Sequence, residues 1–256
     1  MVLHPAEEVY GILEPMISDS FTPNKGRNLD AVAGGVRYLR LPIKTRLIQH
    51  GDDLFKLLAE YVAPHMVPGD MLFISEKIVC ITQGRLISIK DVRVSALAQF
   101  LSKRVRNRVG TPEFRGLGHG TVPAMQLLID EAGYARVLFA VIVAAITRPL
   151  GIKGAFYYLV GKQAKSIDCP MSWTLEPYTE YAKMAPLRPN EVARNIRDTF
   201  NAETVIVDAN YRGTFSLGKS TRAISEKFVR ELLHDNPAGQ DSEMTPFFII
   251  RKAPIT

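Results

Sequence analysis

The feature that most constrains the fold is a set of apolar segments that end in polar or acidic residues. Ser75-Glu76-Lys77 follows one such segment, Ser166-Ile167-Asp168 closes a second, and Val205-Ile206-Val207-Asp208 forms a third. A carboxylate at the exit of a buried strand is costly unless it is paired or binds a cation. The three segments therefore predict a metal and nucleotide site assembled from distant parts of one folded chain.

Composition sets the size of the fold and the class of partner. The chain has 256 residues, of which 46% are hydrophobic, and this is enough for one large domain or two small ones. The net charge of +6 favours anionic partners in general. The tight basic cluster of Lys103, Arg104, Arg106 and Arg108 has no interleaved aromatic residues, so nucleic acid is not an expected partner.

The cysteines and the longest apolar run indicate in which cellular compartment the protein is expected. Cys80 and Cys169 are the only cysteines and form no CxxC spacing, which argues against a disulfide framework and a zinc site. The first residues lack a basic flank followed by an apolar core, so no signal peptide is predicted. The run 137–146 is far shorter than the roughly 20 residues that span a bilayer. We therefore expect a cytoplasmic protein without a membrane partner.

Hydrophobic periodicity and turn residues predict a mixed fold. Residues 1–35 contain several prolines and glycines and are expected to be an N-terminal extension, with one domain of two lobes over 36–256. Helices are expected from Asp52-Asp53 onward and at 95–106, 123–132, 189–200 and 221–233. Strands are expected at 36–40, 45–48, 71–75, 136–146, 156–160, 204–208 and 247–251, with a hairpin that pairs 78–81 with 86–89. The mixture predicts an α+β fold.

The segment 213–220 matches the phosphate-binding pattern GxxxxGKS. An apolar strand is expected before it and a helix after it. Two interpretations stay open, a true P-loop and a phosphate-binding turn in another fold, and both make Arg212, Gly218, Lys219 and Ser220 candidates for phosphate contacts. Too few residues follow the segment to supply the second metal-binding strand that a P-loop domain requires.

Asp168 and Asp208 are the stronger candidates for chemistry, because hard divalent cations take oxygen ligands. The alternative is that each aspartate caps a helix or forms a turn. Lys77 lies in an apolar stretch, where its ammonium group needs either a phosphate partner or access to solvent at a sheet edge. His119, within the glycine-rich loop 110–120, is the histidine of most interest.

The order and spacing of these blocks resemble the coenzyme F-420-0:L-glutamate ligase (gamma-glutamyl ligase) family over roughly residues 36–252. The matching blocks are Gly51-Asp52-Asp53-Leu54, Pro68-Gly69-Asp70, Lys77-Ile78-Val79, Gly84-Arg85, Ile167-Asp168, Val207-Asp208, and Gly239-Gln240 through Glu243. The resemblance implies two α+β lobes that form an intertwined homodimer. The alternative is a monomer in which 136–146 is a central strand.

The resemblance also implies an activity and a set of site residues. It implies a ligase that uses GTP or ATP with magnesium or manganese to join L-glutamate to a small carboxylate acceptor through an acyl phosphate. The implied metal ligands are Asp168, Asp208, Gln240 and Glu243. The implied nucleotide-binding residues are Leu41, Pro42, Ile43, Lys44, Glu76, Lys77, Gly239, Asp241 and Ser242.

The chain departs from the family pattern at two positions that keep other functions open. Ile81 stands where the family usually has a lysine, and Met171 stands where it usually has an asparagine. These departures favour a non-catalytic nucleotide- or metal-binding module as the alternative to a ligase. The segment 213–220 favours a P-loop phosphotransferase as a third possibility.

Overall fold

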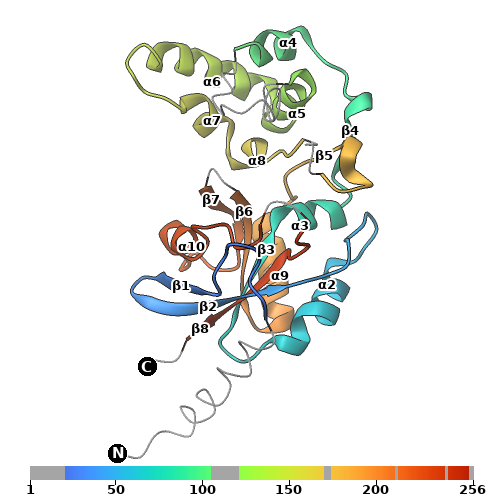
Figure 1. Ribbon diagram of the computed structural model, residues 1–256. Coiled ribbons are helices and arrows are strands. Elements are labelled where there is room, and N and C mark those ends of the chain that lie inside the picture. The colour runs from blue at the N-terminus through green and yellow to red at the C-terminus, as the bar shows by residue number, and fades with distance from the viewer. Residues whose placement is uncertain (1–20, 105–120, 170–173, 211–212, 240–241, 254–256) are drawn as a thin grey trace, which may run out of the picture. The chain divides into compact units, whose positions relative to one another are not determined.

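The protein is described by a computed structural model over residues 21–104, 121–169, 174–210, 213–239 and 242–253. The chain divides into unit 1, which comprises Met1–Thr82 and Arg188–Thr256, and unit 2, which comprises Gln83–Leu187. Both units combine helices and strands, and this confirms the predicted α+β fold (Figure 1). The first strand begins at Asp30, so the sheet starts within the predicted N-terminal extension.

Unit 1 is built on a curled six-stranded sheet. Its strands, in spatial order, are β1 (Asp30–Ala33), β2 (Val36–Ile43), β8 (Phe247–Lys252), β3 (Met71–Ser75), β6 (Glu203–Asn210) and β7 (Gly213–Lys219). β3 is parallel to β6, and both β2 and β3 are antiparallel to β8. The carboxyl ends of β2, β3 and β6 and the amino end of β8 therefore lie along one side of the sheet, which we call the carboxyl edge.

Helices cover both faces of this sheet (Figure 1). α10 (Glu226–Leu232) packs Val229 and Leu232 against the face that carries Phe73 and Val205. α9 (Pro189–Phe200) covers the other face, where the backbone of Pro189 touches Gly218 of β7. The described residues of unit 1 also form α2 (Leu54–Leu57), which continues through a π-helical turn at Leu58–Val62 and a 3-10 turn at Ala63–His65, and α3 (Glu76–Thr82).

Local sequence explains where these helices begin and end. Asp53 accepts hydrogen bonds from the backbone N–H groups of Phe55 and Lys56, as an N-cap should. Pro189 occupies the first turn of α9, where its missing N–H group costs nothing. Asn201 ends the same helix in the left-handed conformation, with φ of 52°. The predicted helices at Asp53 and at 189–200 are therefore confirmed.

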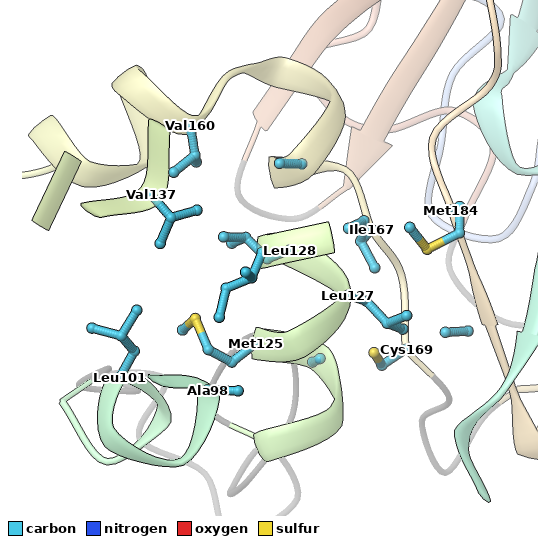
Figure 2. Close-up of a cluster of buried hydrophobic side chains, with 14 of the residues drawn as sticks. Ala98, Leu101, Met125, Leu127, Leu128, Val137, Val160, Ile167, Cys169 and Met184 are labelled. Carbon is cyan, nitrogen blue, oxygen red and sulfur yellow. The ribbon is translucent and has the colours of Figure 1, made fainter. Parts of the chain in front are cut away.

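Unit 2 is mainly helical. It contains β4 (Leu86–Ser88), α4 (Ala96–Ser102), α5 (Val122–Ala132), α6 (Tyr134–Thr147), α7 (Ala155–Val160), α8 (Lys162–Lys165) and β5 (Tyr181–Lys183), with 3-10 turns at Ile89–Asp91 and Tyr178–Glu180. β4 pairs with β5 in a two-stranded antiparallel sheet. The core of unit 2 forms around α5, from which Met125 lies near Leu101 and Leu127 points toward Cys169 (Figure 2).

Three predicted strands are wrong. The run 136–146 is part of helix α6, and 156–160 forms helix α7. The segment 78–81 lies in helix α3, so it forms no hairpin with β4. Short runs rich in Ile, Val and Ala have no period that separates a strand from a buried helix. Within the described residues, no helix combines the length and the apolar character that crossing a membrane requires.

The predicted break of the first strand at Pro42 is also wrong. β2 runs unbroken to Ile43, and 45–48 forms no strand. β1 pairs with β2 only as far as Leu39, so Pro42 lies where one side of β2 is already unpaired. A proline is tolerated at such an edge because no ladder hydrogen bond needs its missing N–H group.

Candidate functional site

The carboxyl edge brings together most of the predicted nucleotide-binding residues of unit 1. Ile43 of β2 and Ile74 of β3 both pair with Phe247, the first residue of β8. The N–H group of Thr45 donates to the carbonyl of Met244 at 2.9 Å, and that of Ser75 donates to the carbonyl of Pro246 at 2.9 Å. The loop before β8 is therefore held between the segment after β2 and the segment after β3.

The residues at the end of β2 divide into buried and exposed groups. Leu41, Pro42 and Ile43 are buried in the sheet, whereas Lys44 is exposed. Lys77, one residue into α3, is exposed as well. β8 separates β2 from β3, and two strand spacings amount to about 10 Å. The two exposed lysines therefore stand at either side of the loop before β8.

Two carboxylates follow neighbouring parallel strands at this edge. Ser75 of β3 is in register with Val207 of β6, so Glu76 and Asp208 follow them at adjacent positions. Glu76 is only 2% exposed, although it carries a carboxylate, and Asp208 is partly exposed. A buried carboxylate next to a second acidic residue is the type of arrangement that a cation stabilises.

The loop from Asn236 to Thr245 is fixed by its own hydrogen bonds. The side-chain amide of Asn236 donates to the carbonyl of Gly239 at 2.8 Å, and the N–H group of Gly239 donates back to the carbonyl of Asn236 at 3.0 Å. The side-chain amide of Asn24 donates to the carbonyl of Pro237 and to the hydroxyl of Thr245, both at 2.7 Å. A residue of the predicted extension thus supports the loop.

Gly239 and Glu243 meet within this loop. Gly239 has φ of 73°, and a Cβ atom there would lie 2.3 Å from the Cδ and Oε1 atoms of Glu243. The positive φ favours glycine at this position, and a larger residue would also displace the flexible end of the Glu243 side chain. Ser242 is exposed, while Gln240 and Asp241 lie outside the described residues. The structure therefore explains the glycine and leaves the roles of the other loop residues as predictions.

The donors at the carboxyl edge suit a cation that also binds phosphate. In the part of the chain that the structure describes, no three His, Cys, Asp or Glu side chains lie close enough to form a metal site by themselves. Magnesium is usually held by one or two carboxylates together with water and the phosphates of its substrate. Asp208 and Glu243 offer carboxylate oxygens of this type, so the edge fits a metal that enters with a nucleotide.

A buried ion pair that the sequence did not reveal anchors the base of the loop. The guanidinium group of Arg40 forms an ion pair with Asp235, donates to the carbonyl of Leu232 at 2.9 Å and to that of Asn28 at 2.6 Å. Burial favours the protonated form of Asp235, but the hydrogen bond and positive charge of Arg40 outweigh it and lower the pKa of this carboxyl group. The pair ties β2 to the residues just before Asn236.

Asp168 lies in unit 2 beside a buried lysine. The N–H group of Asp168 donates to the carbonyl of Lys183 at 2.9 Å, and the N–H group of Lys183 donates back at 2.8 Å. Residues that exchange both hydrogen bonds in an antiparallel pair present their side chains on the same face. Lys183 is 6% exposed and was missed by sequence reasoning, because nothing in the sequence pairs it with Asp168. Asp208 belongs to unit 1, whereas Asp168 belongs to unit 2.

Cys169 follows Asp168 and is buried. Burial raises the pKa of its thiol to about 12, and the negative charge of Asp168 adds to the shift while Lys183 opposes it. The thiol is therefore protonated at neutral pH and is a poor nucleophile.

The expected phosphate-binding turn at 213–220 is wrong. The segment forms strand β7, and a Cβ atom on Gly218 would lie 2.4 Å from the backbone of Pro189. The ammonium group of Lys219 donates to the carbonyl of Ile224 at 2.6 Å. Lys219 pairs with Val205 near the start of β6, away from the carboxyl edge. Gly218 therefore allows α9 to pack closely against β7, and Lys219 hydrogen-bonds to the turn that follows β7.

Several other predicted residues fall outside the described part of the chain. They are Arg212, Met171 and the glycine-rich loop 110–120 with His119. Ser220, the last phosphate candidate, hydrogen-bonds to Glu203 and accepts from the N–H group of Thr204 at 2.9 Å. Its contacts are therefore internal to the sheet.

Comparison with known proteins gives one match. The sequence model of the family described as F420-0:Gamma-glutamyl ligase matches residues 42–235. A search of curated proteins found none that matches this chain. The matched range covers most of the chain and includes the carboxyl ends of β2, β3 and β6 together with Asp168. The chain therefore belongs to the F420-0:gamma-glutamyl ligase family.

Proposed function

We propose that this protein is a ligase that adds L-glutamate to a carboxylate acceptor, with GTP or ATP as the second substrate and magnesium or manganese as the metal. Family membership indicates a ligase that adds glutamate. The observation that carries the finer proposal is the carboxyl edge of unit 1. Two exposed lysines, a buried glutamate, Asp208 and the Gly239–Glu243 contact come from four separate segments and meet there.

Each group at this edge has a chemical task in the proposal. Asp208 and Glu243 would hold the divalent cation, which supplies charge neutralisation at the phosphates when it is bound. Asp168, a residue of unit 2, and Gln240 remain the further ligands that the family resemblance predicts. Lys44 and Lys77 contact phosphate oxygens from the two sides of the loop. The side chains of Leu41, Pro42 and Ile43 are buried in the sheet. These residues would therefore contact the nucleotide through their backbone atoms at the end of β2. Gly239, Asp241 and Ser242 are the further nucleotide contacts that the family resemblance predicts.

The reaction transfers the γ-phosphoryl group of the nucleotide to the acceptor carboxylate, and the nucleoside diphosphate leaves. The resulting acyl phosphate is attacked at its carbonyl carbon by the amino group of glutamate. Inorganic phosphate departs with the C–O bonding electrons, the amine loses a proton, and the amide is formed. Phosphoryl transfer needs mainly positioning and charge stabilisation from the protein, which the fixed strand ends and the hydrogen-bonded loop provide.

The test measures phosphate release in a single turnover. The protein is mixed with GTP or ATP, manganese and the phosphorylated deazaflavin acceptor that the family uses, with or without L-glutamate. We expect phosphate release and an amide product, detected by mass spectrometry, only when glutamate is present. Release of phosphate that ignores both acceptor and glutamate would contradict the proposal.

A non-catalytic nucleotide- or metal-binding module is the second candidate, and one observation favours it. Ile81 replaces the lysine that the family usually carries, and its side chain is buried in α3. One positive charge of the family pattern is therefore absent at this position. In the same experiment, a binding module would retain the nucleotide and metal without turning over.

A further inference from the structure

The loop before β8 has two arms, 236–239 and 242–245, whose backbone needs support from outside the loop. Asn236 has φ of 50° and Gly239 of 73° in the first arm, and Met244 has φ of 51° in the second. Residues other than glycine rarely adopt this left-handed conformation, and they keep it where surrounding contacts hold them. The contacts that hold the two arms therefore also fix the position of Glu243, which the second arm carries.

One side chain from the N-terminal part of the chain ties the two arms together. The side-chain amide of Asn24 donates to the carbonyl of Pro237 in the first arm and to the hydroxyl of Thr245 in the second, both at 2.7 Å. An asparagine amide has two N–H groups to donate, so both are used. The hydroxyl of Thr245 in turn donates to the carbonyl of Ala238 at 3.3 Å. Asn24 thereby sets the separation of the two arms at their base.

Asn24 is itself held in place by the backbone around it. Its carbonyl accepts a hydrogen bond from the N–H group of Arg27 at 2.9 Å, across a turn in which Gly26 has φ of 71°. Beyond this turn, the N–H group of Arg40 in β2 donates to the carbonyl of Leu29 at 2.7 Å. The segment that carries Asn24 is therefore attached to the sheet through β2, so it can hold the arms at a fixed place.

The hydrogen bonds of Asn24 lie close to the residues that the proposed site uses. Pro237 stands two residues before Gly239, and Thr245 stands two residues after Glu243. The arms are packed so closely that a Cβ atom on Gly239 would lie 2.3 Å from the Cδ atom of Glu243. A change in the separation of the arms therefore moves the Glu243 carboxylate. Loss of a residue that supports a metal ligand typically weakens metal binding on the order of tenfold or more.

We propose that residues 24–30 form an N-terminal strap that positions the two loop arms for metal and nucleotide, with Asn24 as the positioning residue. The inference rests on the proposed function, because the ligands are those proposed for the carboxyl edge. Neither Pro237 nor Thr245 is a predicted ligand residue, so Asn24 acts through the arms. All three lie outside the range 42–235 that matches the family, so the family match does not assign this contact.

Hydrogen–deuterium exchange of the free protein tests whether Asn24 orders the arms. We expect Asn24→Ala to raise the exchange rate of a peptide spanning 236–245 on the order of tenfold, because two hydrogen bonds are lost. Asn28→Ala is the matched control. It makes the same substitution at an exposed side chain of the strap and keeps the backbone carbonyl to which Arg40 donates. Wild-type exchange in Asn24→Ala would overturn the proposal.

Calorimetric titration with manganese in the presence of GTP tests whether this order matters to the site. We expect Asn24→Ala to weaken manganese binding on the order of tenfold and Asn28→Ala to leave it unchanged. Wild-type affinity in Asn24→Ala would overturn the proposal, because Asn24 would then support the fold alone. Absence of manganese binding by the wild type would instead overturn the proposed function, and the exchange measurement keeps the two failures apart.

Thr245→Val removes the same contact from the other side. Valine has nearly the shape of threonine but lacks the hydroxyl that accepts from Asn24, so this variant alone should change exchange and manganese affinity in the same direction. In the double variant Asn24→Ala/Thr245→Val the two effects should combine to less than their product, because both remove one shared hydrogen bond. Effects that multiply fully would show that the two side chains act independently and would overturn the strap.

Discussion

At the scale of single residues, Asp208 is the group whose loss should most affect metal binding. A hard cation loses part of its hydration shell when it binds, and anionic oxygen ligands must offset that cost. We expect Asp208→Asn, and likewise Asp168→Asn, to weaken manganese binding on the order of tenfold or more. Isothermal titration calorimetry with the metal measures the effect. Asp198→Asn on the exposed side of α9 is the control, and unchanged affinity in both site variants would remove the proposed metal site.

The ion pair of Arg40 and Asp235 predicts a pH-dependent contribution to stability. The pKa of Asp235 is lowered in the folded protein, so its contribution is fully present above the unfolded pKa of about 3.9 and is lost as the pH falls through the folded pKa. Asp235→Asn should cost about 2 kcal/mol at pH 7, less than for a fully buried pair because Asp235 is partly exposed. Urea unfolding of both proteins measures it.

The difference between the two proteins should shrink as the pH falls below about 4. A difference that stays constant over this range would show that packing, and not the charge of Asp235, fixes the loop. Tryptophan fluorescence or circular dichroism can follow the unfolding in either case.

Residue-level prediction succeeded where a carboxylate follows an obvious strand and failed where the partner is distant. Asp208 could be identified because three apolar residues, Val205, Ile206 and Val207, directly precede it. Arg40 and Asp235 could not, because they are 195 positions apart and neither stands in a pattern that requires the other. Lys183 was missed for the same reason, since its neighbour Asp168 is fixed by backbone pairing that only the fold determines.

At the scale of elements, the buried strands of the six-stranded sheet were predicted well, and the apolar helices were not. β3, β6 and β8 are continuous apolar runs bounded by turn residues, as expected for strands covered on both faces. α6 is also a nearly continuous apolar run, but it is longer and richer in alanine. Its exposed positions are apolar too, so it lacks the 3.6-residue period of apolar and polar residues that would have indicated a helix. The same ambiguity affected α3, whose four apolar residues fit either element.

Lys77 and Lys219, the two lysines that are candidates for binding phosphate, lie at opposite ends of the strands and can be tested separately. Lys77 stands at the carboxyl edge, whereas Lys219 pairs near the opposite end of β6 and donates to Ile224. A nucleoside triphosphate with manganese should raise the melting temperature, because a ligand stabilises the state that it binds. Lys77→Ala should remove most of that rise, and Lys219→Ala should preserve it while lowering the melting temperature without ligand.

Differential scanning fluorimetry with and without nucleotide measures both effects. The ligand-induced rise is the quantity to compare, since it is independent of the stability that each variant loses on its own. A rise that depends on Lys219 and ignores Lys77 would move the phosphates away from the carboxyl edge.

At the scale of the whole molecule, the family resemblance predicts a homodimer. The alternative was a monomer in which 136–146 is a central strand, and that strand is wrong, because the run is part of helix α6 and carries exposed apolar side chains. Light scattering at micromolar concentration should give twice the mass of one chain. A mass equal to one chain would contradict the dimer and leave the proposed reaction untouched.

The division into two units predicts that unit 1 can fold without unit 2. Every strand of the six-stranded sheet and the helices that cover it belong to unit 1. The chain leaves at Gln83 and returns at Leu187, where the side-chain amide of Gln83 donates to the carbonyl of Leu187 at 3.0 Å and accepts from its N–H group at 2.7 Å. The two crossing points are therefore close enough for a linker of about three glycine or serine residues, which spans roughly 10 Å.

A protein in which such a linker replaces 83–187 should unfold in a single cooperative thermal transition. It should retain the nucleotide-induced rise that depends on Lys77, but bind manganese more weakly because Asp168 is absent. Circular dichroism melting with and without nucleotide tests both statements, with the full chain as the reference. An unfolded product would show that the sheet depends on unit 2, and undiminished manganese binding would show that Asp168 is not a ligand.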